Sequence, residues 1–147
     1  MNAEPESASG SCLCGAVAFT APLPPRWVAH CHCTRCQRAH GAAFVTWVGV
    51  DADRAVITDP RGRLHWFEPA ADASPDTGGH RAFCSHCGSP MFFKSPRWPD
   101  ELHIARALFT GPLGFKPQAH AYYDTHVAWV KLGDELPRRP APPASAG

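Results

Sequence analysis

Five side chains that commonly bind metal ions stand within seven consecutive residues of this chain. The segment reads His30-Cys31-His32-Cys33-Thr34-Arg35-Cys36. Cysteines at positions i and i+2 of an extended segment point to the same side, and a third cysteine three residues later can return to them through a turn. The segment therefore predicts three thiolates around one metal ion, with a fourth tetrahedral position either filled by the protein or left open.

The other four cysteines form two further close pairs, CxC and CxxC. An odd total of seven cysteines at such spacings favours metal binding in a reducing compartment over a disulfide framework. The count favours one site of three and one site of four thiolates. The three-cysteine site would contain Cys31, Cys33 and Cys36, and the four-cysteine site would contain Cys12, Cys14, Cys84 and Cys87.

Two other assignments remain open at this point. A zinc ribbon would join Cys33 and Cys36 to Cys84 and Cys87, and it would leave three cysteines beside a metal without a role. Alternatively, a histidine closes the three-cysteine site. The candidates are His30, His32, His40 and His86, of which His32 is the weakest because it lies on the opposite face of an extended Cys31–Cys33 segment.

The rest of the chain predicts a mainly β protein with little helix. Sixteen prolines and twelve glycines favour short strands and turns. One short helix is expected at residues 35–40, ending at Gly41. Strands are expected at residues 16–20, 27–29, 44–50, 56–58, 64–67, 81–83, 91–94, 102–108 and 120–130. Among them, 56–58 and 64–67 are expected to form a hairpin, and 81–83 and 91–94 flank a zinc-knuckle turn.

We expect a single zinc-binding β domain over residues 10–136. Residues 1–9 are polar and residues 137–147 are rich in proline and alanine, so both are predicted to be disordered tails. The loop at residues 68–79 is interpreted as a tolerated insertion rather than a cover over the site.

Charge and hydropathy exclude two classes of partner. The net charge is +1 and the pI is near 7.7, which gives no support to nucleic-acid binding. No apolar run approaches the roughly 18 residues of a membrane span. We therefore expect a soluble, cytoplasmic protein without nucleic-acid or membrane partners, and the sequence does not determine its oligomeric state.

An open three-thiolate site favours one kind of chemistry. Three thiolates make bound zinc electron-rich, so it prefers a fourth thiolate to activating water. The natural incoming ligand is a small thiol, whose pKa the metal lowers so that it can attack an electrophile as the thiolate. We therefore expect chemistry on a thiol substrate.

The motifs resemble those of the glutathione-dependent formaldehyde-activating enzyme family, which also includes centromere protein V. The resemblance covers about residues 10–137. The residues that carry it are Gly10–Gly15, Cys31–Arg38 with Gly41, Ala42 and Trp47, Arg81 and Phe83–Pro90, and the late Pro117 and His120 with Ala128–Val130. Many members also carry a Gly-x-Leu-Asp stretch where this chain has Arg106-Ala107-Leu108-Phe109-Thr110, so an acidic group of the family is missing here.

The resemblance implies a β-tent fold of packed antiparallel sheets and two zinc ions. It implies a structural zinc on Cys12, Cys14, Cys84 and Cys87, and a catalytic zinc on Cys31, Cys33 and Cys36. The activity that it implies is that of a carbon–sulfur lyase, which adds glutathione to formaldehyde to give S-(hydroxymethyl)glutathione. We expect glutathione or a related small thiol as the substrate, and formaldehyde or another aldehyde as the electrophile. A non-catalytic glutathione carrier and a zinc-stabilised interaction module are the alternatives.

Glutathione carries two carboxylates, so a binding pocket needs donors near the open metal position. The candidates are Arg35, Arg38, Trp47 and His120, the last as a hydrogen-bond partner or proton shuttle. Each has a simpler alternative: surface exposure for the arginines, core packing for Trp47 and burial for His120. Arg81 is expected to form a structural ion pair.

The two sites should differ in their importance for stability. Structural zinc contributes on the order of 10–16 kcal/mol of apparent binding free energy, while a domain of this size has roughly 5–15 kcal/mol of net stability. We therefore expect Cys84→Ser or Cys87→Ser to give insoluble or molten protein. Cys33→Ser should leave a folded protein, and the three-cysteine site should lose zinc more readily during purification. Circular dichroism melts test this order, and the reverse order of severity would contradict the assignment.

Overall fold

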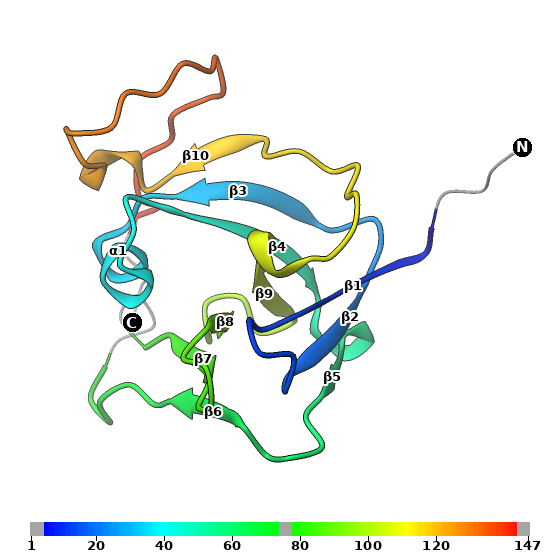
Figure 1. Cartoon of the computed structure of the whole chain (residues 1–147). Helices are drawn as coiled ribbons and strands as arrows, with labels where there is room; N and C mark the ends of the chain where they lie inside the picture. The colour runs from blue at the N-terminus through cyan, green and yellow to red at the C-terminus, as the bar shows by residue number, and fades with distance from the viewer. Residues whose placement is uncertain (1–4, 74–77, 144–147) are drawn as a thin grey trace, which may run out of the picture.

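A computed structural model describes residues 5–73 and 78–143, which form two β-sheets and one short α-helix (Figure 1). The smaller sheet has the antiparallel order β1 (Ser7–Ser11), β2 (Ala18–Pro22), β5 (Val56–Thr58). The larger sheet has the order β10 (Ala119–Ala121), β3 (Trp27–Cys31), β4 (Val45–Asp51), β9 (Glu101–Ala105), β8 (Pro90–Lys94), β7 (His80–Cys84), β6 (Leu64–Phe67). The predicted mainly β fold of antiparallel sheets is confirmed, with one parallel pair, β10 and β3.

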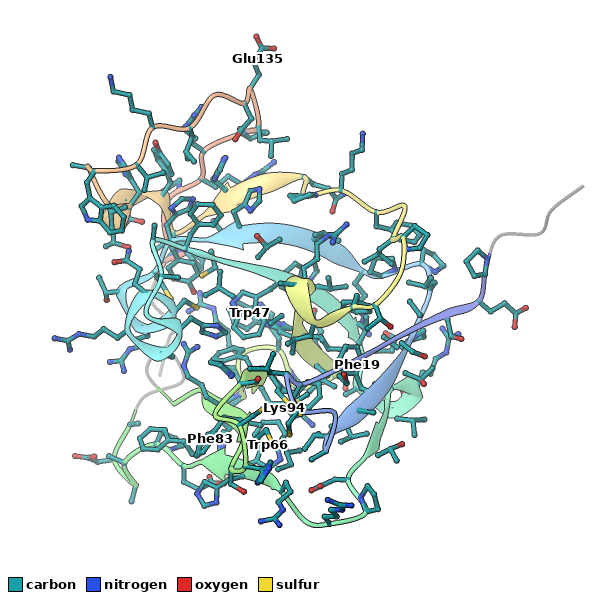
Figure 2. All side chains as sticks on the ribbon, in the orientation of Figure 1. Phe19, Trp47, Trp66, Phe83, Lys94 and Glu135 are labelled. Atoms are coloured by element: carbon teal, nitrogen blue, oxygen red, sulfur yellow. The ribbon has the colours of Figure 1, made fainter. Side chains whose placement is uncertain are left out.

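Apolar side chains from both sheets meet in a common core. Phe19 of β2 packs edge-on against Phe92 of β8, with 5.7 Å between ring centroids. Both rings are buried, and Figure 2 shows Phe19 in the interior between the sheets. Complete burial of one such side chain contributes roughly 1.5–3 kcal/mol. The core therefore fixes how the two sheets pack against each other.

The helix α1 (Thr34–His40) begins and ends at residues that suit those positions. The side chain of Cys33 caps its first turn by accepting a hydrogen bond from the Cys36 backbone N–H at 3.3 Å. Gly41 ends it in the left-handed conformation, with φ of 58°, as glycine commonly does. The predicted helix and its end at Gly41 are confirmed. No helix in the described part of the chain is long and apolar enough to cross a membrane.

The hairpin predicted for residues 56–58 and 64–67 is wrong, although both strands exist. β5 pairs with β2 in the smaller sheet, whereas β6 pairs with β7 in the larger sheet. The Asp59 carboxylate accepts hydrogen bonds from the backbone N–H groups of Arg63 and Leu64, at 2.7 and 2.9 Å. The Asp59 side chain thus pairs two backbone N–H groups of the turn. The turn leads the chain from the smaller sheet to the larger one, and the two strands beside it do not pair with each other.

Several predicted boundaries also differ. The strand expected at 102–108 ends at Ala105 and continues as the 3-10 turn η2 (Arg106–Leu108), and the strand expected at 120–130 is only β10, followed by η3 (Tyr123–Thr125). A third 3-10 turn, η1 (Ala52–Arg54), follows β4. β1 begins at Ser7, and the Arg139 N–H donates to the His120 carbonyl at 2.8 Å. Ordered contacts therefore lie on both sides of the predicted domain, residues 10–136. These domain limits remain a prediction.

Glu101 connects three side chains at the start of β9. Its Oε1 accepts a hydrogen bond from the indole N–H of Trp27 at 2.9 Å. The same oxygen lies 2.9 Å from His103 Nε2. Arg26 is 3.4 Å from its other oxygen, and the Glu101 side chain is only 14% exposed. The hydrogen bond with His103 is the largest cause that holds the pKa of Glu101 below its usual value.

We expect Glu101→Gln to destabilise the fold by about 1–2 kcal/mol at pH 7, because a charge-assisted hydrogen bond becomes a neutral one. A lowered carboxyl pKa contributes stability above the unfolded-state value and loses it as the pH falls through the folded-state value. The deficit of the variant should therefore shrink below about pH 4.5. Urea unfolding of both proteins at each pH measures it, with the exposed Glu135→Gln as control. A deficit that does not change with pH would contradict this account.

Candidate metal centres and active site

The four outer cysteines meet at a junction of the two sheets. Cys12 and Cys14 lie in the turn between β1 and β2, and Cys84 and Cys87 lie at the turn between β7 and β8. Their Sγ atoms all lie within 4.8 Å of one another. The Cys12–Cys14 and Cys14–Cys84 sulfur separations are 3.6 and 3.8 Å. A tetrahedral zinc with Zn–S bonds of ~2.3 Å places its sulfurs ~3.8 Å apart, so this donor set fits zinc.

Backbone hydrogen bonds hold both turns in the form of metal knuckles. The Val17 N–H donates to Cys12 Sγ at 3.4 Å, and the Gly88 N–H donates to the Cys84 carbonyl at 2.7 Å. Gly88 has a φ of 80°, a conformation that side chains rarely allow. The Leu13 N–H donates to Ser89 Oγ at 3.0 Å and ties the two turns together. The zinc-ribbon pairing is therefore wrong: Cys84 and Cys87 group with the first pair.

The central three cysteines form a second cluster on the other side of the core. Cys31 ends β3, Cys33 caps α1 and Cys36 lies in the first turn of the helix, so a strand and a helix start converge on one point. Their Sγ atoms lie within 4.8 Å of one another, with 3.5 Å between Cys31 and Cys36. All seven cysteines are free thiols. This spacing also fits three edges of a zinc tetrahedron.

Two further side chains stabilise a thiolate at Cys36. The Trp47 indole N–H donates to Cys36 Sγ at 3.4 Å, and both terminal nitrogens of Arg81 lie 3.7 Å from that sulfur. Hydrogen bonding with Cys31 and Cys33 lowers the pKa of Cys36 most, and the charge of Arg81 and the Trp47 bond lower it further. The same contacts with its two neighbours raise the pKa of Cys31. The Arg81 guanidinium and the Trp47 indole N–H therefore both face the sulfur of Cys36.

No histidine, cysteine or acidic residue in the described part of the chain adds a fourth ligand atom to this cluster. His30 instead bonds to Thr46 at 2.7 Å, and the ring of His40 packs edge-on against Trp47 at 5.2 Å. Burial lowers the pKa of His32 to about 4, so its ring is neutral at pH 7. The three-cysteine cluster thus presents three protein donors.

The three cysteines line the wall of a large cavity of about 1060 Å³. Arg35 and Trp47, two of the residues predicted for a substrate pocket, also line it, whereas Arg38 and His120 do not. The lining includes Phe67 and described residues of the 68–79 loop, so this segment forms part of the wall and the tolerated-insertion interpretation is corrected. Residues 74–77 of that loop lie outside the described part of the chain.

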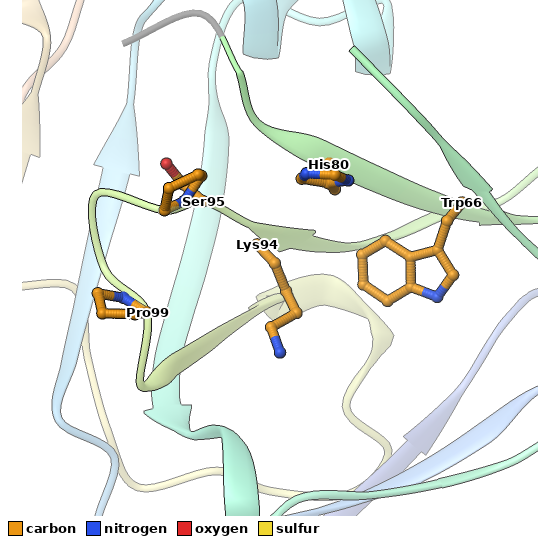
Figure 3. A pocket seen from close by; sticks show the side chains of 6 residues that line it. Trp66, His80, Lys94, Ser95 and Pro99 are labelled. Atoms are coloured by element: carbon orange, nitrogen blue, oxygen red, sulfur yellow. The ribbon is translucent and has the colours of Figure 1, made fainter. Parts of the chain in front are cut away.

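A smaller cavity, about 350 Å³, lies on the β6–β8 side of the molecule (Figure 3). Trp66, His80 and Lys94 line it, and it contains none of the cysteines. The large cavity is therefore the candidate active site.

His120 is completely buried on β10 and takes part in a chain of hydrogen bonds behind the central cysteines. Its Nδ1 lies 2.8 Å from His32 Nε2, and its Nε2 lies 3.0 Å from the Asp134 carboxylate. The His32 carbonyl accepts from Gln37 and Thr125, at 2.7 and 3.1 Å. Through its contact with His32, His120 thus supports the backbone that carries Cys31 and Cys33. The sequence suggested that His120 contacts a ligand directly; the structure instead places it in a buried position outside the cavity lining.

Sequence reasoning did not assign most of the cavity-lining residues to the site, among them Arg81 and Tyr122. Arg81 of β7 and Cys36 of α1 are 45 residues apart in the sequence and meet only in the folded protein. Arg81 contacts the Cys36 sulfur, whereas the sequence analysis expected it to form a structural ion pair. Tyr122 lines the cavity and is the non-glycine residue with a positive φ, 55°, in the described chain. Strained residues of this kind cluster at functional sites, but no sequence pattern marks this one.

Comparison with known proteins supports one family. A family model described as glutathione-dependent formaldehyde-activating enzyme matches residues 7–125. A Halomonas elongata protein that provisionally carries this family's name is 32% identical over 127 residues, which span 84% of this chain and 79% of that protein. The crystal structure of a Rhodobacter sphaeroides protein has a TM-score of 0.56 at 20% identity and covers 72% of this chain and 91% of that one. This last likeness supports the fold alone.

We expect Arg81→Gln to weaken metal binding at the three-cysteine cluster by about 10- to 100-fold, the usual effect of removing an outer partner of a metal ligand. The physical reason is that the guanidinium offsets negative charge on Cys36. Chelator competition measures the affinity of each site. Binding at the four-cysteine cluster should not change, and neither site should change in Arg38→Gln, an exposed residue of α1. Equal weakening of both sites in Arg81→Gln would contradict the role.

Proposed function

Because the chain belongs to the glutathione-dependent formaldehyde-activating enzyme family, we propose that it joins the thiol of glutathione to formaldehyde and forms S-(hydroxymethyl)glutathione. This reaction makes it a carbon–sulfur lyase in the reverse direction. The observation that carries the proposal is the three-cysteine cluster in the wall of the large cavity, without a fourth protein ligand among the described residues. The cavity can therefore deliver the fourth donor.

We assign Zn²⁺ to both clusters, because the sulfur separations fit its tetrahedral geometry. Cys12, Cys14, Cys84 and Cys87 would hold the structural ion, and Cys31, Cys33 and Cys36 the ion at the active site. When bound there, zinc supplies one thing: it lowers the pKa of an incoming thiol. A reducing compartment such as the cytoplasm suits seven cysteines that form no disulfide.

Charged side chains in the cavity match the charges of glutathione. Arg35 and Arg139 both line it, and a guanidinium binds a carboxylate through two parallel hydrogen bonds. Asp72 lines the cavity as well and offers a carboxylate to the ammonium group of the tripeptide. These groups would orient glutathione with its sulfur toward Cys31, Cys33 and Cys36.

The reaction needs a hydrogen-bond donor that stabilises the negative charge developing on the aldehyde oxygen. The thiolate sulfur forms a bond to the carbonyl carbon, the C=O π electrons move to oxygen, and the proton released by the thiol ends on that oxygen. Burial raises the pKa of Tyr122, so its hydroxyl stays a neutral hydrogen-bond donor at pH 7. Tyr122 lines the same cavity and would stabilise the developing charge on oxygen.

Cobalt substitution tests the proposal, because the visible spectrum of Co²⁺ reports its thiolate ligands. We expect two metal ions per chain, one of which changes its spectrum when glutathione is added. S-methylglutathione, which lacks the thiol, should cause no change, and Cys33→Ser should abolish the response. The protein should also speed the approach of glutathione and formaldehyde to equilibrium, as measured by NMR exchange.

The outcomes separate the competing functions. Thiol binding without faster equilibration would contradict the enzyme and favour a glutathione carrier. One tightly held metal ion that ignores thiols would favour a zinc-stabilised interaction module.

A further inference from the structure

One wall of the large cavity is made of aromatic rings. This aromatic wall consists of side chains from β3, β4, β8, β9 and the segment between β8 and β9, all of which line the cavity: Trp27, Trp47, Phe93, Trp98 and His103. Ring centroids are 6.0 Å apart for Trp47 and Phe93, and 5.4 Å apart for Phe93 and His103. The His103 centroid is 4.6 Å from that of Trp27 and 5.5 Å from that of Trp98. The rings therefore form one continuous surface.

This surface begins at the reactive end of the cavity. The Trp47 indole N–H donates to Cys36 Sγ at 3.4 Å, so the first ring of the wall touches the three-cysteine cluster. From Trp47 the ring contacts lead along neighbouring strands to Trp98. A ligand that reacts at the cluster would thus have the aromatic wall beside it.

Polar atoms of three wall residues, Trp47, Trp27 and His103, already have protein partners. Trp27 Nε1 donates to Glu101 Oε1, and His103 Nε2 lies 2.9 Å from the same oxygen. The indole of Trp27 packs on Gly49 of β4, where a Cβ atom would come within 2.3 Å of the ring. The ring can lie against the sheet because Gly49 has no side chain. Two guanidinium groups also lie over the wall: Arg81 Cζ is 4.8 Å from the centroid of the Phe93 ring, and Arg97 Cζ is 5.7 Å from that of Trp98. The remaining ring surface is carbon, which binds apolar groups by removing them from water.

Neither substrate of the family reaction accounts for such a wall. Glutathione ends in charged groups, for which the cavity offers Arg35, Arg139 and Asp72. Formaldehyde carries only hydrogen on its carbonyl carbon. A cavity of about 1060 Å³ is slightly larger than the ~300–1,000 Å³ of pockets that hold drug-sized ligands. Resting on the function proposed above, we propose that the aldehyde partner carries an aromatic or similarly large apolar group, which packs on the aromatic wall while its carbonyl carbon lies at the three-cysteine cluster.

The chemistry balances without a further reactant. The glutathione sulfur forms a bond to the carbonyl carbon, the C=O π electrons become a lone pair on oxygen, and the proton lost by the thiol protonates that oxygen. The product is a hemithioacetal with the substituent of the aldehyde on its carbon. Nothing is oxidised or reduced, so the step differs from the formaldehyde reaction only in the group that the wall accommodates.

The test compares two aldehydes on the zinc-loaded full chain with glutathione. For formaldehyde and phenylacetaldehyde, the rate of hemithioacetal formation is divided by the uncatalysed rate, and the ratio of the two accelerations is the preference. We expect the wild type to prefer phenylacetaldehyde by about tenfold or more, since burial of a ring on aromatic neighbours is worth at least that factor. 2-Phenylethanol, which has the same ring but no carbonyl, should inhibit competitively.

Variants of Trp98 locate the preference. Trp98→Ala should lower the ratio by about tenfold, and Trp98→Phe, which keeps a ring, should retain most of it. The matched control is Trp129→Ala, because Trp129 is 74% exposed and lies outside the cavity lining. This control should leave the ratio unchanged. If Trp98→Ala does not fold, inhibition of the wild type by 2-phenylethanol still decides the question, and no competitive inhibition would overturn the aromatic subsite.

Failure of this inference is distinct from failure of the proposed function. Acceleration with formaldehyde but no preference for phenylacetaldehyde, or an unchanged ratio in Trp98→Ala, would overturn the aromatic subsite alone. No acceleration with either aldehyde would overturn both proposals, and the cobalt titration would then show whether the site still binds the thiol.

Discussion

The cluster of Cys12, Cys14, Cys84 and Cys87 joins the two sheets of this protein. The first two belong to a turn of the smaller sheet and the last two to a turn of the larger sheet, so one group of four sulfurs connects segments about seventy residues apart. A metal ion held by these four sulfurs would link the two segments and reduce the conformational entropy of the unfolded chain. The edge-on contact of Phe19 with Phe92 lies in the same junction.

Charge balance explains how the second cluster differs. Three thiolates and one divalent ion leave a negative charge, which is costly in a partly buried site unless it is compensated. Arg81 supplies the opposite charge at Cys36, and the Trp47 indole supplies a hydrogen bond to the same sulfur. Within the aromatic wall, the Glu101 carboxylate engages Trp27 and His103. The site therefore combines an anionic metal-binding cluster with an apolar wall, a combination that suits a thiol and an apolar electrophile better than water.

Local features of this fold could be predicted from the sequence, and long-range ones could not. The spacing of the cysteines indicated both clusters, and Gly41 marked the end of α1. The split of β5 and β6 between two sheets was missed, because the turn at Asp59 has the same composition whether its flanking strands pair or diverge. The burial of His120 depends on Asp134 and on His32, 88 residues away. Contacts of this kind arise from sheet order, which no local pattern encodes.

The central claim is that one metal ion has three protein thiolates and takes its fourth donor from outside the chain. Cadmium-113 NMR of the cadmium-loaded protein tests it most directly, because the chemical shift depends strongly on the number of bound thiolates. The account predicts two resonances, one at the position of a four-thiolate site and one typical of three, and glutathione should move only the second toward the first. Two resonances that both lie at the four-thiolate position before glutathione is added would contradict it.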